Sequence, residues 1–173
     1  MRPVTCGAVS SVSLRPATVA DAEQIRAIYN HEVTQTTATF DLVPRSLTDQ
    51  RAWLAARSGA FSAIVAIDDA GTVVGFGSLS PYRDRAAYRT SVEDSVYVRR
   101  DRHGEGIGRA LLTELVAVAR RSGFHTVFAR IEAGGAASRA LHAACGFALV
   151  GIEREVGRKF NRWLDVAVMQ ILL

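Results

Sequence analysis

The sequence predicts an α+β fold in which helices pack on a sheet of about seven strands. Strand-type and helix-type segments alternate along the chain, and no internal repeat or low-complexity linker interrupts them. The chain has 173 residues, of which 49% are hydrophobic, enough to bury the core of one globular domain. We therefore expect a single domain at residues 14–173, after a loose N-terminal extension at residues 1–13.

The first third of the chain predicts a short strand and two helices. Residues 11–15 resemble a strand that Pro16 ends, and Thr18 and Asp21 favour a helix start. The apolar positions of that helix recur at helical spacing: Ala22, Ile25, Ile28 and Tyr29. After the polar loop "QTTATFDLVPRS", Ser46 or Thr48 can cap a second helix that we expect to end near Gly59.

The rest of the chain supplies the remaining strands. "FSAIVAI" and "VVGFGSL" flank Asp-Asp-Ala-Gly as a hairpin, and an arginine-rich loop leads to a strand at 91–98. A glycine-rich loop then opens a helix, and the strand "FHTVFARIE", a short helix and two closing strands complete the sheet. The apolar face of the first of these helices is expected at Ile107, Leu111, Leu115 and Val118, and that of the short one at Ala137, Leu141 and Ala144.

Charge and composition argue against nucleic acid and membranes as binding partners of this chain. The net charge is +4 and the pI about 9.6, but the basic residues are spread along the chain, so they are a weak signal for nucleic acid. Only Arg99, Arg100, Arg102 and Arg109 cluster, around the glycine loop. No stretch is long and apolar enough for a membrane span or a signal peptide. We expect a soluble cytoplasmic protein that binds neither nucleic acid nor membrane.

The cysteines and histidines do not predict a metal site or a disulfide. Cys6 and Cys145 form no CxxC pair, so reduced thiols are expected. His31 and His125 have no further ligands at metal-binding spacing. We therefore predict no metal.

The stretch "VYVRRDRHGEGIGRALLTEL" predicts an anion-binding loop. Its glycines at 104, 106 and 108 allow close backbone approach, and a helix that starts near Gly106 would present unpaired N–H groups. A P-loop would need Gly-Lys-Ser/Thr at its end, and a dinucleotide fingerprint would need glycine where Arg109 stands. The loop therefore suits a phosphate group but fits neither motif.

Several motifs together carry a family resemblance. "SVYV", "HGEGIG" and "ASRALHAACGF", in this order, resemble the acetyl-CoA-dependent N-acetyltransferases of the GNAT superfamily. "RPATVADAEQIRAIYN", "TTATF", "VEDSVYV" and "GRKFNRWLDVAVMQ" resemble the phosphinothricin and methionine sulfoximine acetyltransferases within it. The resemblance covers residues 14–173. It implies a mostly antiparallel twisted sheet with helices on both faces, a splayed cleft between the fourth and fifth strands, and a homodimer.

The resemblance also implies how acetyl-CoA is held. Backbone N–H groups of the glycine loop would bind the pyrophosphate. The residues implied in cofactor binding are Val96, Tyr97, Val98, His103, Gly104, Glu105, Gly106, Ile107, Gly108, Arg109 and Gly135. Two of them depart from the family pattern: His103 stands where Arg or Gln is usual, and Gly135 where Asn is usual. We expect these departures to weaken cofactor binding without abolishing it.

Acetyl transfer to an amine needs a base for the ammonium proton and an acid for the departing thiolate. Glu93 is the favoured base, because strand alternation places it with Ser95 and Tyr97, opposite Val92, Val96 and Val98. Asp94 is the fallback base, and its position on the valine face favours a structural role. The resemblance implies His142 as the acid. A covalent route through Cys145 is disfavoured, because that residue continues a small apolar face.

Substrate recognition is expected in the loop "SPYRDRAAYR". An arginine fork suits a carboxylate, and the resemblance implies substrate contacts at Arg83, Asp84, Arg85, Glu93, Asp94 and Ser95. Arg85 replaces a commonly apolar residue. Phe40 and Trp163 are candidate pocket walls, although such aromatics often belong to a core.

Three functions follow from these residues. The first is N-acetylation of a small amino-acid-like molecule such as phosphinothricin, methionine sulfoximine or methionine sulfone. The second is acetylation of a protein N-terminus or lysine, for which an acidic groove would be expected rather than a basic loop. The third is a non-enzymatic acyl-CoA-binding module, which would not need Glu93 and His142. We expect the first.

Overall fold

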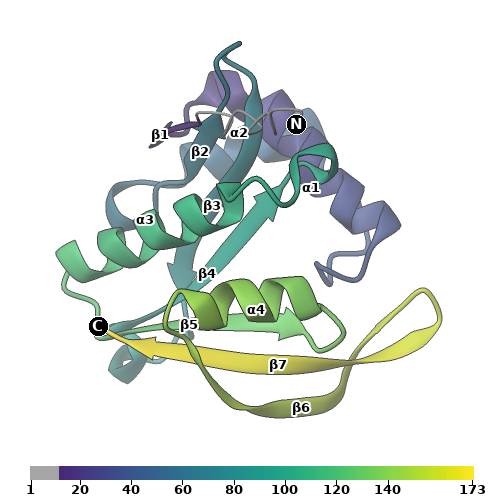
Figure 1. The fold of residues 1–173 in the computed structure, drawn as a ribbon, viewed down its shortest axis with the longest axis vertical. Coiled ribbons are helices and arrows are strands. Elements are labelled where there is room, and N and C mark those ends of the chain that lie inside the picture. The colour runs from purple at the N-terminus through teal and green to yellow at the C-terminus, as the bar shows by residue number, and fades with distance from the viewer. Residues whose placement is uncertain (1–11) are drawn as a thin grey trace, which may run out of the picture.

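A computed structural model describes residues 12–173, which form one seven-stranded sheet in the order β1-β2-β3-β4-β5-β7-β6 (Figure 1). The strands are β1 (Ser13–Pro16), β2 (Ile64–Ile67), β3 (Val73–Pro81), β4 (Ser91–Val98), β5 (Thr126–Glu132), β6 (Ala148–Lys159) and β7 (Arg162–Leu172). The helices are α1 (Ala22–Gln35), α2 (Leu47–Ala55), α3 (Ile107–Arg121) and α4 (Ala136–Ala144). The mixed α+β fold is confirmed. Of the expected N-terminal extension, residues 1–11 lie outside the described part, as does Cys6.

The helix termini follow the predicted capping signals with one correction. Ser46 caps α2: its Oγ accepts from the Asp49 N–H at 3.1 Å, and the Asp49 carboxylate accepts from the Ser46 N–H. The helix ends at Ala55, and not near Gly59 as expected. Gly59 instead begins a short 3-10 turn with φ at +56°, a value that suits glycine.

The strands β4 and β5 run parallel and separate after three residue pairs. Their pairing covers Ser91–Thr126, Val92–Val127 and Glu93–Phe128, whereas all other strand pairs are antiparallel. Beyond Glu93, β4 continues to Val98 and β5 to Glu132 without pairing with each other. Figure 1 shows the two strands diverging there. The predicted mostly antiparallel sheet with a splay between strands 4 and 5 is confirmed.

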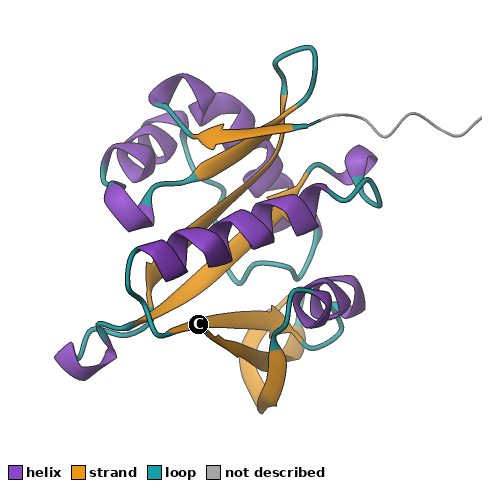
Figure 2. Ribbon diagram, turned by 60° about the vertical axis from the view of Figure 1, so that its left-hand side comes forward, coloured by secondary structure: helices purple, strands orange, loops and turns teal. Residues whose placement is uncertain are grey.

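Helices cover both faces of the sheet (Figure 2). On one face Ile107, Leu111 and Leu115 of α3 are buried against Val92 and Val127. On the other face, a second core joins α1 and α2 to the sheet through Ile25, Tyr29, Leu54, Val65 and Phe76. These two cores fix β3 and β4 between helices, which holds the strand beside the splay in place.

The short helix α4 turns a different face inward from the one expected. Ala137 and Ala144 are exposed, whereas His142 is buried, with Ser138, Leu141 and Cys145 partly buried. Alanines occur all around this nine-residue helix, so apolar spacing did not identify its inner face. The inward face of α4 therefore carries a buried histidine, His142, as a candidate functional residue.

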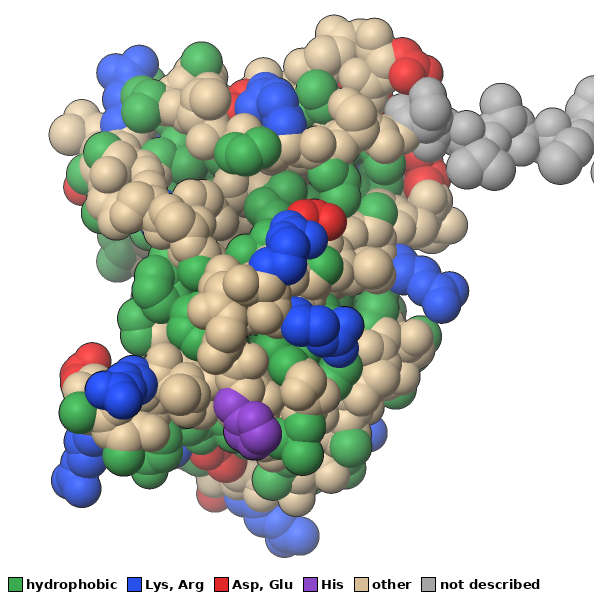
Figure 3. Space-filling view, turned by 90° about the vertical axis from the view of Figure 1, so that its left-hand side faces the viewer, with side chains coloured by type: hydrophobic (Ala, Val, Ile, Leu, Met, Phe, Trp, Pro, Cys, Tyr) green, Lys and Arg blue, Asp and Glu red, His purple; other side chains and the backbone are tan. Residues whose placement is uncertain are grey.

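Basic side chains are dispersed over the surface. In Figure 3, Lys and Arg side chains are scattered among hydrophobic and neutral atoms and form no continuous stripe on the face shown. Within residues 12–173, no helix is long and apolar enough to cross a bilayer.

Candidate functional site

A cleft of about 1160 Å³ opens where β4 and β5 diverge. It lies between the loop after α1, the unpaired part of β4, the glycine loop, the end of β5 and helix α4. This volume exceeds a compact single-ligand pocket and suits a cosubstrate together with an acceptor.

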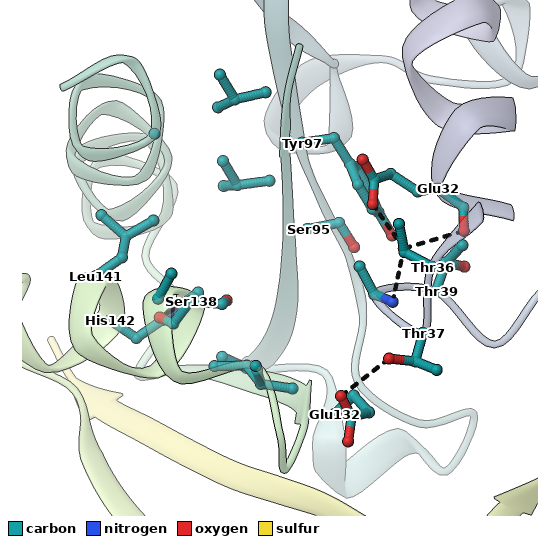
Figure 4. Close-up of a pocket in the computed structure, with 18 of the residues that line it drawn as sticks. Glu32, Thr36, Thr37, Thr39, Ser95, Tyr97, Glu132, Ser138, Leu141 and His142 are labelled. Atoms are coloured by element: carbon teal, nitrogen blue, oxygen red, sulfur yellow. Dashed lines mark hydrogen bonds between the residues drawn. The ribbon is translucent and has the colours of Figure 1, made fainter. Parts of the chain in front are cut away.

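The alternation of β4 divides the cleft into two sides. Figure 4 shows Ser95 and Tyr97 extending toward Thr36 and Thr39, whereas Ser138, Leu141 and His142 lie on α4 across the strand. Glu93 belongs to the face of Ser95 and Tyr97, and Asp94 belongs to the valine face. The strand therefore presents Glu93 to one side of the cleft and Asp94 to the other.

The glycine loop has the geometry of an anion cradle. Gly104 and Gly106 adopt φ of +84° and +82°, and α3 begins directly after Gly106 with no side-chain cap. The free N–H groups of the first turn of α3 therefore face a region that a pyrophosphate can occupy. Gly108 serves packing instead, because a Cβ there would lie 3.2 Å from Leu141 Cδ2.

The arginines around the loop are mostly engaged within the protein. Arg99 pairs with Asp101, Arg100 with Glu32, and Arg102 with both Asp68 and Glu105. Within residues 12–173, the Arg109 guanidinium makes no such ion pair. The cradle therefore relies on its backbone and on Arg109 more than the clustering of four arginines suggests.

The predicted cofactor-binding residues line the cleft, with the exception of Glu105. The Glu105 carboxylate accepts from Arg102 Nε at 2.9 Å, which fixes the loop from outside. His103 Nε2 lies 3.0 Å from the Val98 carbonyl, so this side chain also supports the loop. At Gly135 a Cβ would lie 3.0 Å from the Glu132 carbonyl oxygen, and glycine relieves that contact.

His142 and Asp94 form a buried pair on the α4 side. His142 Nε2 lies 3.1 Å from Asp94 Oδ2, and His142 Nδ1 lies 2.7 Å from the Ser138 carbonyl oxygen. Burial lowers the pKa of His142, but the hydrogen bond and charge of Asp94 and the Ser138 carbonyl outweigh it and raise the pKa. Because both ring nitrogens face acceptors, the geometry favours an imidazolium.

Asp94 is thereby placed as the partner of the histidine. Its Oδ2 contacts His142, and its buried Oδ1 has no hydrogen-bond partner among the described residues. This supports the structural role over that of the fallback base.

Glu93 lines the opposite side of the cleft and is partly buried. Burial raises the pKa of its carboxyl, the charge of Arg130 lowers it, and the charges of Asp94 and Glu153 raise it, with a net upward shift. A carboxylate with a raised pKa is a stronger base and can still be ionised near neutral pH.

The wall opposite α4 is formed by the segment Thr36–Phe40, which is fastened at several points. Thr36 Oγ1 donates to Glu32 at 2.7 Å, and Thr37 Oγ1 donates to Glu132 at 3.0 Å (Figure 4). Lys159, at the end of β6, donates to the carbonyls of Thr39 at 2.7 Å and Glu32 at 3.3 Å. Burial lowers the pKa of Lys159. The β6–β7 hairpin thus holds this wall.

Only some of the predicted substrate-binding residues lie in the cleft. Glu93, Asp94 and Ser95 line the cleft, whereas Arg83, Asp84 and Arg85 do not. The guanidinium carbon of Arg83 lies 5.1 Å from the Tyr82 ring centre and 5.8 Å from that of Tyr88. Phe40 lines the cleft, but Trp163 does not and is 61% exposed.

Several lining residues were not identified from the sequence. Glu32, Arg130 and Glu132 line the cleft, and Lys159 supports its wall. The uniqueness of Lys159 in an arginine-rich chain was the one available signal. Among residues 12–173, no group of three or more His, Cys, Asp or Glu is arranged to hold a metal ion.

The glycine loop, the splayed sheet, and a carboxylate and an aspartate–histidine pair on opposite faces of one strand form a site typical of acyl-CoA-dependent N-acyltransferases. The model of the acetyltransferase (GNAT) domain matches residues 14–168, and the chain belongs to this family. It is similar to an L-methionine sulfoximine/L-methionine sulfone acetyltransferase of Pseudomonas paraeruginosa, with 44% identity over 94% of this chain and 95% of the relative.

Solved structures agree with this assignment. A phosphinothricin acetyltransferase of Sinorhizobium meliloti in complex with AcCoA has a TM-score of 0.90 at 39% identity, covering 94% of this chain and 88% of that one. A ribosomal-protein-alanine N-acetyltransferase of Brucella melitensis has a TM-score of 0.90 at 43% identity, covering 93% and 99%. Acetyl-CoA is therefore the cosubstrate that the cleft is built to receive.

We predict that Gly106→Val weakens acetyl-CoA binding. A Cβ at Gly106 meets no atom within 4 Å, so the substitution acts by straining a backbone at φ +82° and by filling the anion seat. Titration calorimetry should show at least about a tenfold loss, or about 1.4 kcal/mol. Gly123→Val is the matched control, since Gly123 has φ +77° and equally open space at the far end of α3. Equal losses in both variants would remove the loop from the site.

We also predict that Asp94→Asn lowers the pKa of His142. In the wild type, the imidazolium stabilises the fold below the unfolded-state pKa of about 6.5, and this stability is lost as pH rises through the raised folded-state pKa. In Asp94→Asn, NMR titration of the imidazole ring should give a lower pKa for His142. Urea unfolding across the same pH range should show a smaller loss of stability as the pH rises. Asp84→Asn removes an equal charge elsewhere and should change neither. An unaltered His142 titration in Asp94→Asn would contradict the ion pair.

Proposed function

We propose that this enzyme transfers an acetyl group from acetyl-CoA to the amino group of a small amino-acid-like substrate of the methionine sulfoximine, methionine sulfone or phosphinothricin type. The observation that carries the proposal is the placement of Glu93 and the Asp94–His142 pair on opposite faces of β4, where its pairing with β5 ends. The names of the relatives support the substrate class.

In the proposed mechanism, the unpaired backbone of Val96 to Val98 and the glycine loop would hold the cosubstrate. Acetyl-CoA supplies an activated thioester carbonyl. Glu93 accepts the proton of the substrate ammonium, directly or through water, and leaves an amine able to attack. His142 is kept protonated by Asp94 and the Ser138 carbonyl, and on release of one of these hydrogen bonds its ring N–H donates the proton to the departing thiolate.

The second candidate function is acetylation of a protein N-terminus. It is supported by the name of the similar Brucella structure, a ribosomal-protein-alanine N-acetyltransferase. An extended peptide needs an open groove. Here the wall at Thr36–Phe40 is fastened to Glu132 of β5 and to Lys159 of β6, and this arrangement favours a short substrate.

We further propose a cytoplasmic homodimer. Apolar side chains outside the cleft are exposed on β6, at Val150 and Ile152, and on the loop between α1 and α2, at Leu42 and Val43. Exposed apolar side chains of this kind suit a self-complementary interface. Sedimentation at micromolar concentration tests it.

We predict that Glu93→Gln lowers kcat near neutral pH by about two or more orders of magnitude, the usual contribution of a positioned general base. The amide keeps the shape of the side chain but cannot accept the proton. Raising the pH should restore part of the rate, since more substrate amine is then unprotonated. Acetyl-CoA affinity, measured by calorimetry, should stay near wild type. Wild-type turnover at pH 7 would sink the assignment.

We predict that Arg83 recognises the substrate carboxylate. Tyr82 stacks on Phe128, the register partner of Glu93, so the loop that carries Arg83 approaches the Glu93 side. In a thiol-release assay over amino acids, their decarboxylated amines and basic peptides, Arg83→Ala should raise KM for amino acids by at least about tenfold, or about 1.4 kcal/mol, and barely affect the amines. Arg89→Ala, on the same loop, is the control. Equal losses for both substrate types would remove Arg83 from the substrate, and activity confined to peptides would favour the second candidate.

A further inference from the structure

Glu93 shares one face of the sheet with two charged side chains that have no role in the proposed mechanism, Arg130 and Glu153. Glu93 pairs in register with Phe128, and Arg130 follows two residues along β5 on the same face. Arg130 pairs with Val168 of β7, and Glu153 of β6 pairs with Val166, which places Glu153 on that face too. The face therefore carries Glu93, Arg130 and Glu153 on three different strands.

Arg130 is held in a fixed orientation. Its Nη1 donates to Glu153 Oε1 at 2.9 Å, and its Nη2 donates to Glu153 Oε2, a fork-to-fork contact across β7. The two side chains are about one-third exposed, at 30% and 34%, so the pair contributes little to stability. Arg130 also lines the cleft with Glu93, where its charge acts on the carboxyl group.

We propose that Arg130 and Glu153 are positioning residues that together set the electrostatic environment in which Glu93 accepts the substrate proton. This inference rests on the proposed role of Glu93 as the base. Arg130 favours the ionised carboxylate, and Glu153 both anchors Arg130 and offsets part of its charge.

The opposing effects on Glu93 explain why a pair is useful. Burial raises the pKa of Glu93 and would leave it protonated over more of the pH range, whereas Arg130 lowers it. Glu153 and Asp94 raise the pKa of Glu93 in turn, and the charge of Asp94 is itself paired with His142 of α4. Tyr82, after β3, is the other titratable group that acts on Arg130 at this point. A lone arginine would make the carboxylate a weaker base and would be free to bind anions.

The test uses substitutions with opposite expected signs. Arg130→Gln removes the positive charge and leaves Glu153 uncompensated, so the acid limb of the kcat/KM profile should move to higher pH by about half to one unit. Glu153→Gln removes the negative charge and should move the limb to lower pH. The double variant removes a neutral pair and should lie near wild type, and so should Arg130→Lys, which keeps the charge. Shifts of the same sign in both single variants would overturn the proposal.

A second readout separates this inference from the proposed function. The Glu93 carboxyl can be titrated by carbon NMR in each variant, with its resonance assigned by loss in Glu93→Gln. Opposite movements of this titration support the electrostatic role even if the kinetic limb does not follow, and that combination would overturn Glu93 as the base. An unmoved Glu93 titration in both Arg130→Gln and Glu153→Gln would overturn the inference itself. If one single variant folds poorly, the other single variant can still be compared with Arg130→Lys and the double variant, for which a Glu93 titration near that of the wild type is expected.

Discussion

The site depends on one constraint: β4 and β5 pair over three residues and then separate. Backbone N–H and C=O groups need partners when they are buried, so a strand that loses its neighbour in the middle of a sheet must be satisfied by something else. Here residues 94–98, which pair with β3 on one side and with no strand on the other, border the cleft. Helix α3 packs behind it and prevents β4 from collapsing onto β5, because Leu111 and Leu115 fill the core on that side. The opening is thus maintained by core packing, and it leaves one edge of β4 without a neighbouring strand beyond Glu93.

Charges around this opening are distributed so that few remain free. Arg100 is taken up by Glu32, Arg102 by Asp68 and Glu105, Arg130 by Glu153, and His142 by Asp94. Pairing keeps guanidinium groups in fixed positions and limits their attraction to unrelated anions. Within residues 12–173, the exceptions that line the cleft are Arg109, at the first turn of α3 beside the cradle, and Arg162, at the start of β7. A chain with a net charge of +4 can therefore present a selective anion seat rather than a generally basic surface.

Local patterns predicted the parts of the fold that local physics controls. The strand Ser91–Val98 and its alternation, which sets Glu93 apart from the valines, follow from a period of two, and the glycine loop follows from its positive-φ positions. The contacts that complete the site join distant residues: Asp94 with His142, Thr37 with Glu132, and Lys159 with Thr39. They depend on sheet register across several strands, which no single segment specifies. The inner face of α4 was missed for a related reason, since alanines on all sides leave its orientation to tertiary packing.

The β6–β7 hairpin joins the wall of the cleft to the far edge of the sheet. Its far end carries Lys159, a buried amine that donates to two carbonyls of the α1 segment and its following loop, and Gly157 lies so close to Phe40 that a Cβ would reach the ring at 2.2 Å. A buried ammonium is costly unless its hydrogen bonds are satisfied, so this contact holds only when the hairpin and the loop keep one relative position. The same hairpin also exposes Val150 and Ile152, which do not line the cleft. Any partner that covers these side chains would therefore contact the same hairpin that holds the wall of the cleft through Lys159.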